Sequence, residues 1–424
     1  MIGYEEALAL LLRDVVPLDT ESVAAFDGAG RVLAADVRSP GFLPRFDNAA
    51  MDGFALALGD ATGEAGTEWP VLGSTAAGDA AGQPAGPARQ GAWEIMTGAV
   101  MPDGLDSVVP VERVDASGGT DGTPPTRIRL REPVRTGANV RRRGEDIAEG
   151  ARVLAKCERL GPAQIMLLAA LGIERVPLVR RPRVALIATG RELAEIGEAD
   201  EGAWIHDSNT PFLRLRLHAA GAEVVARERV GDDPVGFTAV LDRVLAQRPD
   251  LVISTGAVSR GRFDFVPGSL RARGADVRFH GVAIRPGKPL LCARLREGPL
   301  HVGLPGNPAS CAVGLRFFVE PLLRAMLGLP RERPARLPLA APVHARANLR
   351  THLHAMLEGD GEGRLAVHPL PRQESFRLAP FLSSQAWLVL PEAGDGDTVI
   401  EPGQAVDVYP PGHLEPLAWQ QESP

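Results

Sequence analysis

The sequence predicts a multidomain α/β plus β protein: a doubly wound α/β domain combined with a β-rich insert and a C-terminal all-β domain. Three observations support this fold class. The chain has 424 residues, enough for about three domains of about 150 residues. Strand and helix patterns alternate between residues 181 and 330. Before and after that stretch, short strand-like segments are separated by Gly and Pro turns.

The first 138 residues contain a helix followed by the β-rich insert. Apolar positions Leu8, Leu11, Leu12, Val15 and Val16 predict a helix near the N-terminus, with a polar connection after it. Segments 93–97 and 107–111 are strand-like. Residues 47–138 hold thirteen acidic and six basic residues, so this region carries as much net negative charge as the whole chain. We expect one of its faces to interact with cationic groups.

The α/β pattern begins with the continuous apolar run 184–188, which is typical of a buried parallel strand. Further strands are expected at 223–226, 251–254, 290–293 and 300–302. Helices are expected near Pro211, after Asp232-Asp233-Pro234, and from 309 to 327. This order predicts a doubly wound domain. After residue 331, strand-like segments such as 353–357, 364–368 and 387–390 predict a small barrel or sandwich.

Composition excludes several classes of protein. Three widely spaced cysteines build neither a disulfide framework nor a metal knuckle, which favours a reducing, cytoplasmic setting. The longest near-apolar run, 165–173, is too short to cross a membrane. The net charge of −7 and the absence of a basic tail argue against nucleic acid as a partner. Dinucleotide, P-loop and serine-hydrolase motifs all fail at required positions.

Polar loops follow the predicted strands at the edge where parallel sheets bind ligands. They contain Thr189, the pair Ser254 and Gly256, and the turn Pro305-Gly306-Asn307, which opens a helix. A helix start with free N–H groups can receive an anion, although a well-capped helix is the simpler reading of that turn alone. Three such loops on one sheet edge favour a phosphate-bearing ligand.

Carboxylates occur in the same loops: Glu192, Asp207, Asp232 and Asp264. Each taken singly is most often a helix cap or a solvated group. As a set beside a phosphate site, they indicate Mg²⁺ or a similar cation. Arg285 and Lys288 follow another strand on a proline-stiffened turn that suits an oxyanion. The segment Arg141 to Asp146 is equally consistent with an interface patch and a ligand contact, and spacing alone does not assign Asp52 or Thr97.

Nine motifs in order along the chain resemble the molybdopterin molybdenumtransferase family, which includes MoeA and the E domain of gephyrin. They are FDNAAMDG, MTGAVMP, RRRGEDI, TGREL, HDSN, DDP, STGAVS, IRPGKP and LPGNPAS. The resemblance implies four domains: a discontinuous N-terminal domain (1–46 and 139–180), the β-rich insert (47–138), a molybdopterin-binding α/β domain (181–330) and a C-terminal small β-barrel (331–424). It also implies a homodimer whose cleft is shared by two chains, with a molybdopterin adenylyltransferase as a candidate partner.

The resemblance further implies a reaction and the residues that perform it. Family members insert molybdate into adenylylated molybdopterin and release AMP with Mg²⁺. The implied catalytic residues are Asp52, Glu192, Asp207 and Asp264, of which the last three would hold the metal. The implied substrate-binding residues are Thr97, Asp146, Thr189, Asp232, Ser254, Gly256, Arg285, Lys288, Pro305, Gly306, Asn307, Arg350 and Ser375, with Asp52 and Thr97 supplied by the partner subunit.

Some positions depart from the family pattern. The departures are Arg191, Ala257, Arg262, Gly281 and His354. Added positive charge at Arg191 and Arg262 would either hold molybdate more tightly or displace the metal. Two alternatives to the enzyme therefore stay open: a catalytically weak molybdopterin or molybdenum-cofactor carrier on the same fold, and a different nucleotide-dependent transferase.

Overall fold

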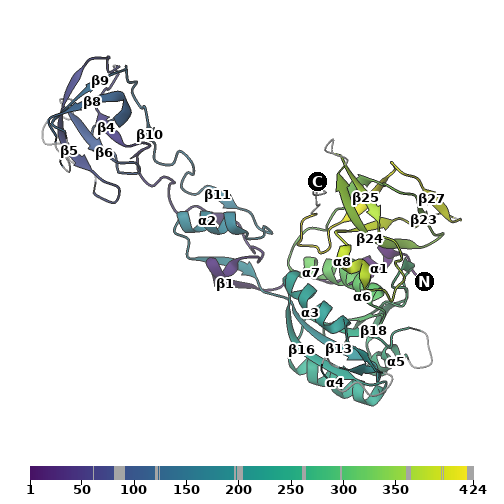
Figure 1. Ribbon diagram of the computed structural model, residues 1–424. Helices are drawn as coiled ribbons and strands as arrows, with labels where there is room; N and C mark the ends of the chain where they lie inside the picture. The colour runs from purple at the N-terminus through teal and green to yellow at the C-terminus, as the bar shows by residue number, and fades with distance from the viewer. Residues whose placement is uncertain are drawn as a thin grey trace.

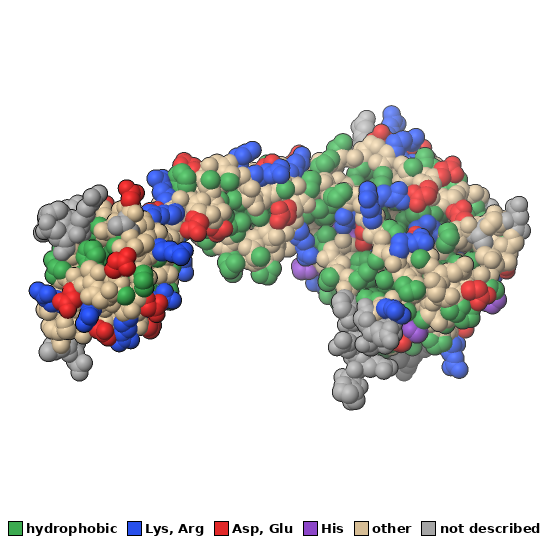
Figure 2. All heavy atoms as spheres, turned by 90° about the horizontal axis from the view of Figure 1, so that it is seen from above, with side chains coloured by type: hydrophobic (Ala, Val, Ile, Leu, Met, Phe, Trp, Pro, Cys, Tyr) green, Lys and Arg blue, Asp and Glu red, His purple; other side chains and the backbone are tan. Residues whose placement is uncertain are grey.

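The chain forms an elongated molecule in which a narrow arm joins a distal sheet to a larger body (Figures 1 and 2). The computed structural model describes residues 1–60, 62–80, 91–119, 123, 125–194, 197, 204–259, 264–296, 298–359, 364–392, 394 and 396–417. Among these residues, no helix is long and apolar enough to cross a bilayer.

The distal sheet has six strands and lies at the far end of the arm. Its order is β7 (Ser107–Pro110), β4 (Gly53–Leu56), β6 (Ala92–Ile95), β5 (Glu68–Thr75), β9 (Arg127–Leu130) and β8 (Val114–Ser117). Both of its faces are packed: Ala55 and Val108 contribute to one apolar cluster, whereas Phe54 and Val109 contribute to another. The expected β-rich insert is therefore a folded unit with its own core.

The arm consists of short antiparallel ribbons and one helix. The ribbons pair β1 (Thr20–Ala24) with β12 (Arg175–Val179), β2 (Val37–Arg38) with β11 (Arg152–Leu154), and β3 (Asn48–Ala49) with β10 (Val140–Arg141). Helix α2 (Pro162–Ala170) packs on them through Leu168. Because the chain passes outward and returns through these ribbons, the arm is built from two separate stretches of sequence.

The N-terminal helix differs from its expected place and length. Helix α1 (Tyr4–Leu12) buries Leu8 and Leu11 in the core of the body, not in the arm to which the division at 1–46 assigns it. It ends before Val15 and Val16 because the chain turns at Asp14, whose φ is +65°. Apolar spacing identifies the buried face of a helix but not the domain that covers it.

The body contains a doubly wound sheet in the order β16 (Glu223–Val230), β13 (Arg183–Thr189), β17 (Leu251–Thr255), β21 (Leu300–Leu304), β20 (Leu291–Arg294) and β18 (Asp276–His280). The first four strands are parallel. Helix α3 (Asn209–Ala219) packs on one face, and helices α4 (Pro234–Ala246) and α5 (Val266–Ala272) pack on the other.

The predicted long helix after β21 is one helical run with a π-helical middle, made of α6 (Pro308–Gly314), η4 (Leu315–Val319) and α7 (Glu320–Met326). Pro321 has no N–H to donate to the carbonyl of Phe317 four residues earlier. The hydroxyl of Tyr4 donates to that carbonyl at 3.2 Å instead. Helix α1 thus compensates for a proline in the core of the body.

The C-terminal strands close into a small barrel. Strands β24 (Arg350–Gly359), β26 (Ala386–Leu390), β28 (Ala405–Tyr409) and β22 (Ala335–Pro338) are neighbours in order, β25 (Leu365–Pro369) pairs with β24, and β23 (Val343–Ala345) pairs with β27 (Thr398–Ile400). A bridge between Leu339 and Val367 connects β22 to β25 and completes the ring. Helix α8 (Ala379–Ser383) lies beside it, and β19 (Ile284–Arg285) pairs in parallel with the first residues of β24.

Candidate active site

The polar loops of the body line one cavity at the carboxyl edge of the doubly wound sheet. From β13 the chain passes to β16 on one side and then to β17 on the other, so the sheet has its switch point here. The cavity has a volume of about 690 Å³. The predicted residues that line it are Thr189, Glu192, Asp207, Asp232, Gly256, Asp264, Pro305, Gly306 and Asn307.

Glycine is required where two of these loops touch. The N–H of Gly256 donates to the carbonyl of Leu304 at 3.0 Å, and the hydroxyl of Thr189 donates to the carbonyl of Thr255 at 2.8 Å. Gly256 has a φ of +81°, and a Cβ there would lie 2.6 Å from the Thr189 carbonyl oxygen. Strands β13, β17 and β21 are therefore locked together at the floor of the cavity.

Three of the four carboxylates in the cavity have a local structural role or a cationic neighbour, and the fourth, Glu192, is exposed. Oδ1 of Asp207 accepts the N–H of Thr210 at 3.0 Å in the first turn of α3, and Oδ2 of Asp264 accepts the Ser259 hydroxyl at 2.6 Å. Asp232 lies 4.0 Å from Nε of Arg191. Its neighbour Asp233 caps α4, which leaves Asp232 to the cavity.

These carboxylates do not form a preassembled metal centre. Among the described residues, no three His, Cys, Asp or Glu side chains are grouped so that they could hold an ion. Oxygen donors in a cavity still suit Mg²⁺, because this cation often takes only one or two carboxylates and completes its shell with phosphate oxygens and water. The donor chemistry fits such a cation when a phosphate-bearing ligand is also bound.

The C-terminal domain contributes to the cavity through one loop. The amide of Asn307 donates to the hydroxyl of Ser375 at 3.1 Å, and the N–H of Ala309 donates to the Ser375 carbonyl at 3.0 Å. Phe376 and Leu378 from the same loop line the cavity. Neither was a candidate from sequence, because no motif pattern marks an exposed apolar residue in a loop.

Asn209 and Thr255 are two further lining residues that sequence reasoning did not single out. The amide of Asn209 donates to the carbonyl of Gly306 at 2.7 Å, which ties the start of α3 to the turn before α6. Both residues stand in loops whose neighbours were candidates. Their position at a strand end or a helix start is the signal that could have found them.

Five predicted binding residues of the body and the C-terminal domain lie outside the cavity lining: Ser375, described above, and four others. Ser254 is fully buried and its hydroxyl lies 2.9 Å from Nε2 of His301, whose pKa burial lowers to about 3. Arg285 and Lys288 are exposed, although Pro289 of the same turn lines the cavity. The guanidinium of Arg350 lies 4.3 Å from the centre of the Tyr4 ring.

Three other candidates lie away from the body. Asp52 and Thr97 belong to loops of the distal sheet, and Asp146 lies in the exposed loop between β10 and β11 of the arm; both parts are seen apart from the body in Figure 1. Oδ1 of Asp52 accepts both the N–H and the hydroxyl of Thr97, at 2.6 and 2.7 Å. These two donors lower the pKa of Asp52, with the backbone N–H as the larger cause. The arm separates this group from the cavity within one chain.

The positions that depart from the family pattern have varied surroundings. Arg191 is largely exposed, Ala257 has a φ of +50°, and Gly281 has a φ of +96°. His354 is buried, with its ring centre 4.1 Å from that of Trp387. Arg262 lies outside the described residues.

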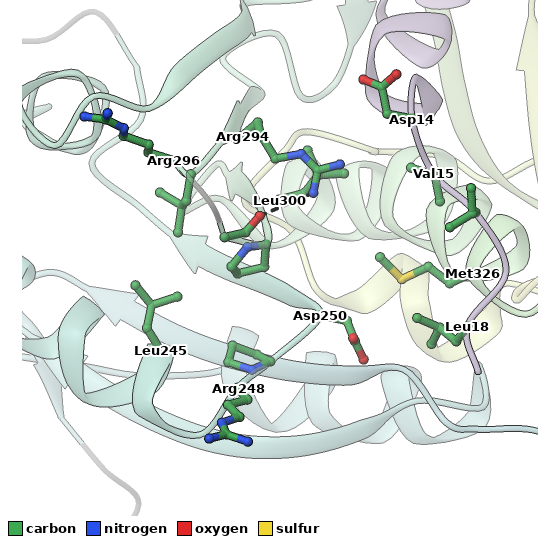
Figure 3. A pocket seen from close by; sticks show the side chains of 15 residues that line it. Asp14, Val15, Leu18, Leu245, Arg248, Asp250, Arg294, Arg296, Leu300 and Met326 are labelled. Carbon is green, nitrogen blue, oxygen red and sulfur yellow. Dashed lines mark hydrogen bonds between the residues drawn. The ribbon is translucent and has the colours of Figure 1, made fainter. Parts of the chain in front are cut away.

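A second hollow, of about 560 Å³, lies at the opposite, amino edge of the same sheet (Figure 3). Leu300, Met326 and Arg294 line it together with Asp250. Asp250 is held by both terminal nitrogens of Arg180 at 2.7 Å, a paired arrangement at the root of the arm. None of the residues predicted to bind or react lines this hollow.

Comparisons with known proteins agree with the fold. The MoeA N-terminal region (domain I and II) matches residues 2–172, a probable molybdopterin binding domain matches 185–325, and the MoeA C-terminal region (domain IV) matches 336–410. The chain thus has the layout of a multidomain protein with a molybdopterin-binding type of α/β domain.

Similar proteins extend over nearly the whole chain. The molybdopterin molybdenumtransferase of Synechococcus elongatus is 38% identical over 405 residues, which are 93% of this chain and 96% of that protein. The Bacillus subtilis protein of the same name is 33% identical over 398 residues, 92% of this chain and 89% of that protein. A solved structure of the molybdopterin biosynthesis MoeA protein from Pyrococcus horikosii has a TM-score of 0.79 and 27% identity, and covers 97% of this chain and 99% of that one.

The chain belongs to the MoeA family. The resemblance expected from the nine motifs and the multidomain α/β plus β fold class are both confirmed.

Proposed function

We propose that this chain is a molybdopterin molybdenumtransferase, which inserts molybdate into adenylylated molybdopterin and releases AMP. The observation that carries the proposal is the cavity at the sheet switch point, which four carboxylates line together with the Pro305-Gly306-Asn307 turn. Relatives that bear this enzyme's name match more than nine-tenths of the chain, which supports the same reaction class.

Each part of the cavity has a role in the proposed reaction. Backbone N–H groups at the turn before α6 would receive phosphate oxygens of the adenylylated substrate. Asn209 and Ser375 hold that turn in place, so the phosphorus atom would meet a fixed surface. One or two of Glu192, Asp207 and Asp264 would hold Mg²⁺, which when bound neutralises the charge on the phosphoryl group.

A second copy of the chain would complete the cleft. Asp52 and Thr97 lie on the distal sheet, beyond the arm, and would enter the cavity of a partner subunit in a homodimer. The arm offers apolar surface for such an association: Met166 is 71% exposed and Phe26 is 81% exposed, and hydrophobic side chains are visible along it in Figure 2. A molybdopterin adenylyltransferase, which would make the adenylylated substrate, is a candidate partner.

The test supplies purified protein with adenylylated molybdopterin, molybdate and Mg²⁺, and measures AMP by chromatography. We expect AMP release well above the buffer rate, together with formation of molybdenum-loaded cofactor. Release no faster than in buffer, with the substrate bound, would reject the enzyme and favour a carrier.

The carrier is the second candidate because Arg191 lies beside Asp232 in the cavity region. A guanidinium there competes with a metal cation for the same carboxylates. If the carrier is correct, Arg191→Asp restores AMP release in a protein that otherwise only binds the pterin.

A further inference from the structure

One wall of the cavity is apolar and exposed, in contrast to the hydroxyls and carboxylates around it. Phe376 is 63% exposed and Leu378 is 52% exposed, and both line the cavity. Neither belongs to any of the apolar clusters found among the described residues. Folding of the chain alone therefore does not explain why these two side chains stand at this place.

The loop that carries Phe376 is fixed by hydrogen bonds to two other parts of the structure, strand β24 and the turn before α6. Gln373 accepts the backbone N–H of His354 at 2.6 Å through Oε1 and donates to the His354 carbonyl at 3.0 Å through Nε2. Ser375 is tied to Asn307 and Ala309 by the two hydrogen bonds described above. Phe376 follows directly, so its ring stands on backbone that is anchored to β24 and to the turn before α6. A wall mounted in this way is organised before a ligand arrives.

We propose that Phe376, with Leu378, is the wall against which a planar heteroaromatic ring of the substrate lies. This inference rests on the proposed function, because adenylylated molybdopterin carries such a ring on each side of its diphosphate link: adenine on one and pterin on the other. The ring would stack on Phe376 while the phosphates meet the neighbouring turn at Gly306. Aromatic groups are usual in ligand cavities, where they supply area and a few polar groups supply orientation.

The guanidinium of Arg377 strengthens the wall. It lies 5.3 Å from the centre of the Phe376 ring and is paired with the carboxylate of Glu374. The guanidinium therefore packs beside the ring, within the range of a cation–π contact. A flat aromatic wall suits either flat ring, adenine or pterin.

The experiment measures dissociation constants by calorimetry for AMP, molybdopterin and ribose 5-phosphate, with the full-length protein. AMP carries adenine, molybdopterin carries the pterin, and ribose 5-phosphate carries a phosphate without a ring. Phe376→Ala should weaken the binding of AMP or of molybdopterin about two- to tenfold and leave the affinity for ribose 5-phosphate unchanged. The ligand whose affinity falls identifies the ring that stacks on Phe376. Phe376→Tyr should restore the affinity.

Leu382→Ala is the matched control, because Leu382 is 92% exposed in the same domain and does not line the cavity. Equal weakening of all three ligands by Phe376→Ala, or no weakening of any, overturns the inference. Dissociation of a wild-type dimer in this variant, seen by sedimentation, would also overturn it by making Phe376 an interface residue. Wild-type protein that binds neither ring-bearing ligand contradicts the proposed function as well. AMP release that persists with unchanged affinities in the variant contradicts only the role of Phe376.

Discussion

Helix α3 begins at the cavity and ends in a second, very different group of charged side chains. We call that group the junction cluster: Arg216, Arg316, Glu320, Glu332 and Glu415. Glu320 is buried and lies 3.1 Å from Arg216 and 3.5 Å from Arg316, while Arg316 also binds Glu332 with two nitrogens, at 2.9 and 2.8 Å. In the cavity, by contrast, Glu192 is exposed, and Asp232 lies no closer than 4.0 Å to Nε of Arg191.

The contrast separates charges that hold the fold from charges that are available to a ligand. A buried ion is costly unless it is paired and hydrogen-bonded, so the junction cluster is nearly saturated by its own members and by the N–H of His413, which donates to Glu320 at 2.8 Å. Burial raises the pKa of Glu320, and the two arginines oppose this shift. Carboxylates at the rim of a cavity carry no such cost and can exchange water for a metal or a phosphate-bound cation.

The largest expected effect is on folding, from Glu320→Ala. This change leaves Arg216 and Arg316 close together in the core without the carboxylate between them, and should lower the free energy of unfolding by about 3–5 kcal/mol. Urea unfolding followed by circular dichroism measures the loss. The control is Glu5→Ala, since Glu5 pairs with Arg331 at an exposed site and should cost about 0–1 kcal/mol. Equal losses of stability in the two variants would show that the buried carboxylate of Glu320 contributes no more to folding than an exposed one.

Asp207→Asn tests the cavity side of the comparison. Asparagine caps a helix about as well as aspartate, so the bond from Thr210 should survive and the free energy of unfolding should change by less than about 0.5 kcal/mol. AMP release should nevertheless fall by about a hundredfold or more, because one of the carboxylates proposed to hold the cation is lost.

Asp233→Asn is the control for that prediction, because Asp233 caps α4 next to the cavity without lining it. We expect its activity to match that of the wild type. Its free energy of unfolding should fall by about 0.5–1.5 kcal/mol, because Asp233 accepts the N–H groups of Val235 and Gly236 through both of its oxygens and asparagine has only one acceptor oxygen. If Asp207→Asn retains full activity, the carboxyl group of Asp207 is a helix cap and nothing more.

The sequence predicts the parallel strands and the loops at their ends well, because buried apolar runs and Gly turns are local signals. It does not decide which residue of a loop faces the cavity. Strand β17 is buried on both faces, so no alternation of polar and apolar residues separates Ser254, which turns into the core, from Thr255, which lines the cavity. The sequence therefore held no signal that would have selected Thr255 instead of Ser254 as the residue that lines the cavity.

Contacts between distant segments are the other part that local patterns do not contain. Glu320 is 104 residues from Arg216 and Glu415 is 199 residues from it, and only the docking of the C-terminal segment onto α3 and α7 brings them together. Phe376 reaches the cavity in the same way, on a loop from another domain. Asp52 and Thr97 require a further step, the placement of a second chain.

The pH dependence of stability should include a contribution from a histidine that adjoins the junction cluster. Burial, with a smaller contribution from Arg324, lowers the pKa of His413 to about 3, against an ordinary value of 6.5. The unfolded chain therefore takes up a proton that the folded chain does not, and stability is complete above pH 6.5 and falls as the pH drops toward 3.

His413→Gln should take up one proton fewer on unfolding between pH 6.5 and 4. The free energy of unfolding from urea titrations at a series of pH values would then have a smaller slope than in the wild type. The control is His344→Gln, since His344 is exposed on β23. An unchanged slope in His413→Gln would show that the ring is already charged in the folded junction.

The smallest expected effect comes from Thr97→Val, which tests the carboxylate of Asp52. This group is exposed but is held in one orientation by Thr97. The change removes the hydroxyl donor at 2.7 Å and keeps the backbone N–H donor at 2.6 Å, so the pKa of Asp52 should rise part of the way to its ordinary value. Carboxyl chemical shifts followed through a pH titration measure this. If Asp52 serves the cleft of a partner subunit, AMP release should also fall, by about fivefold, with no change in unfolding. A shifted pKa with full activity would separate the orientation of Asp52 from the reaction and leave the body's own carboxylates as the reactive set.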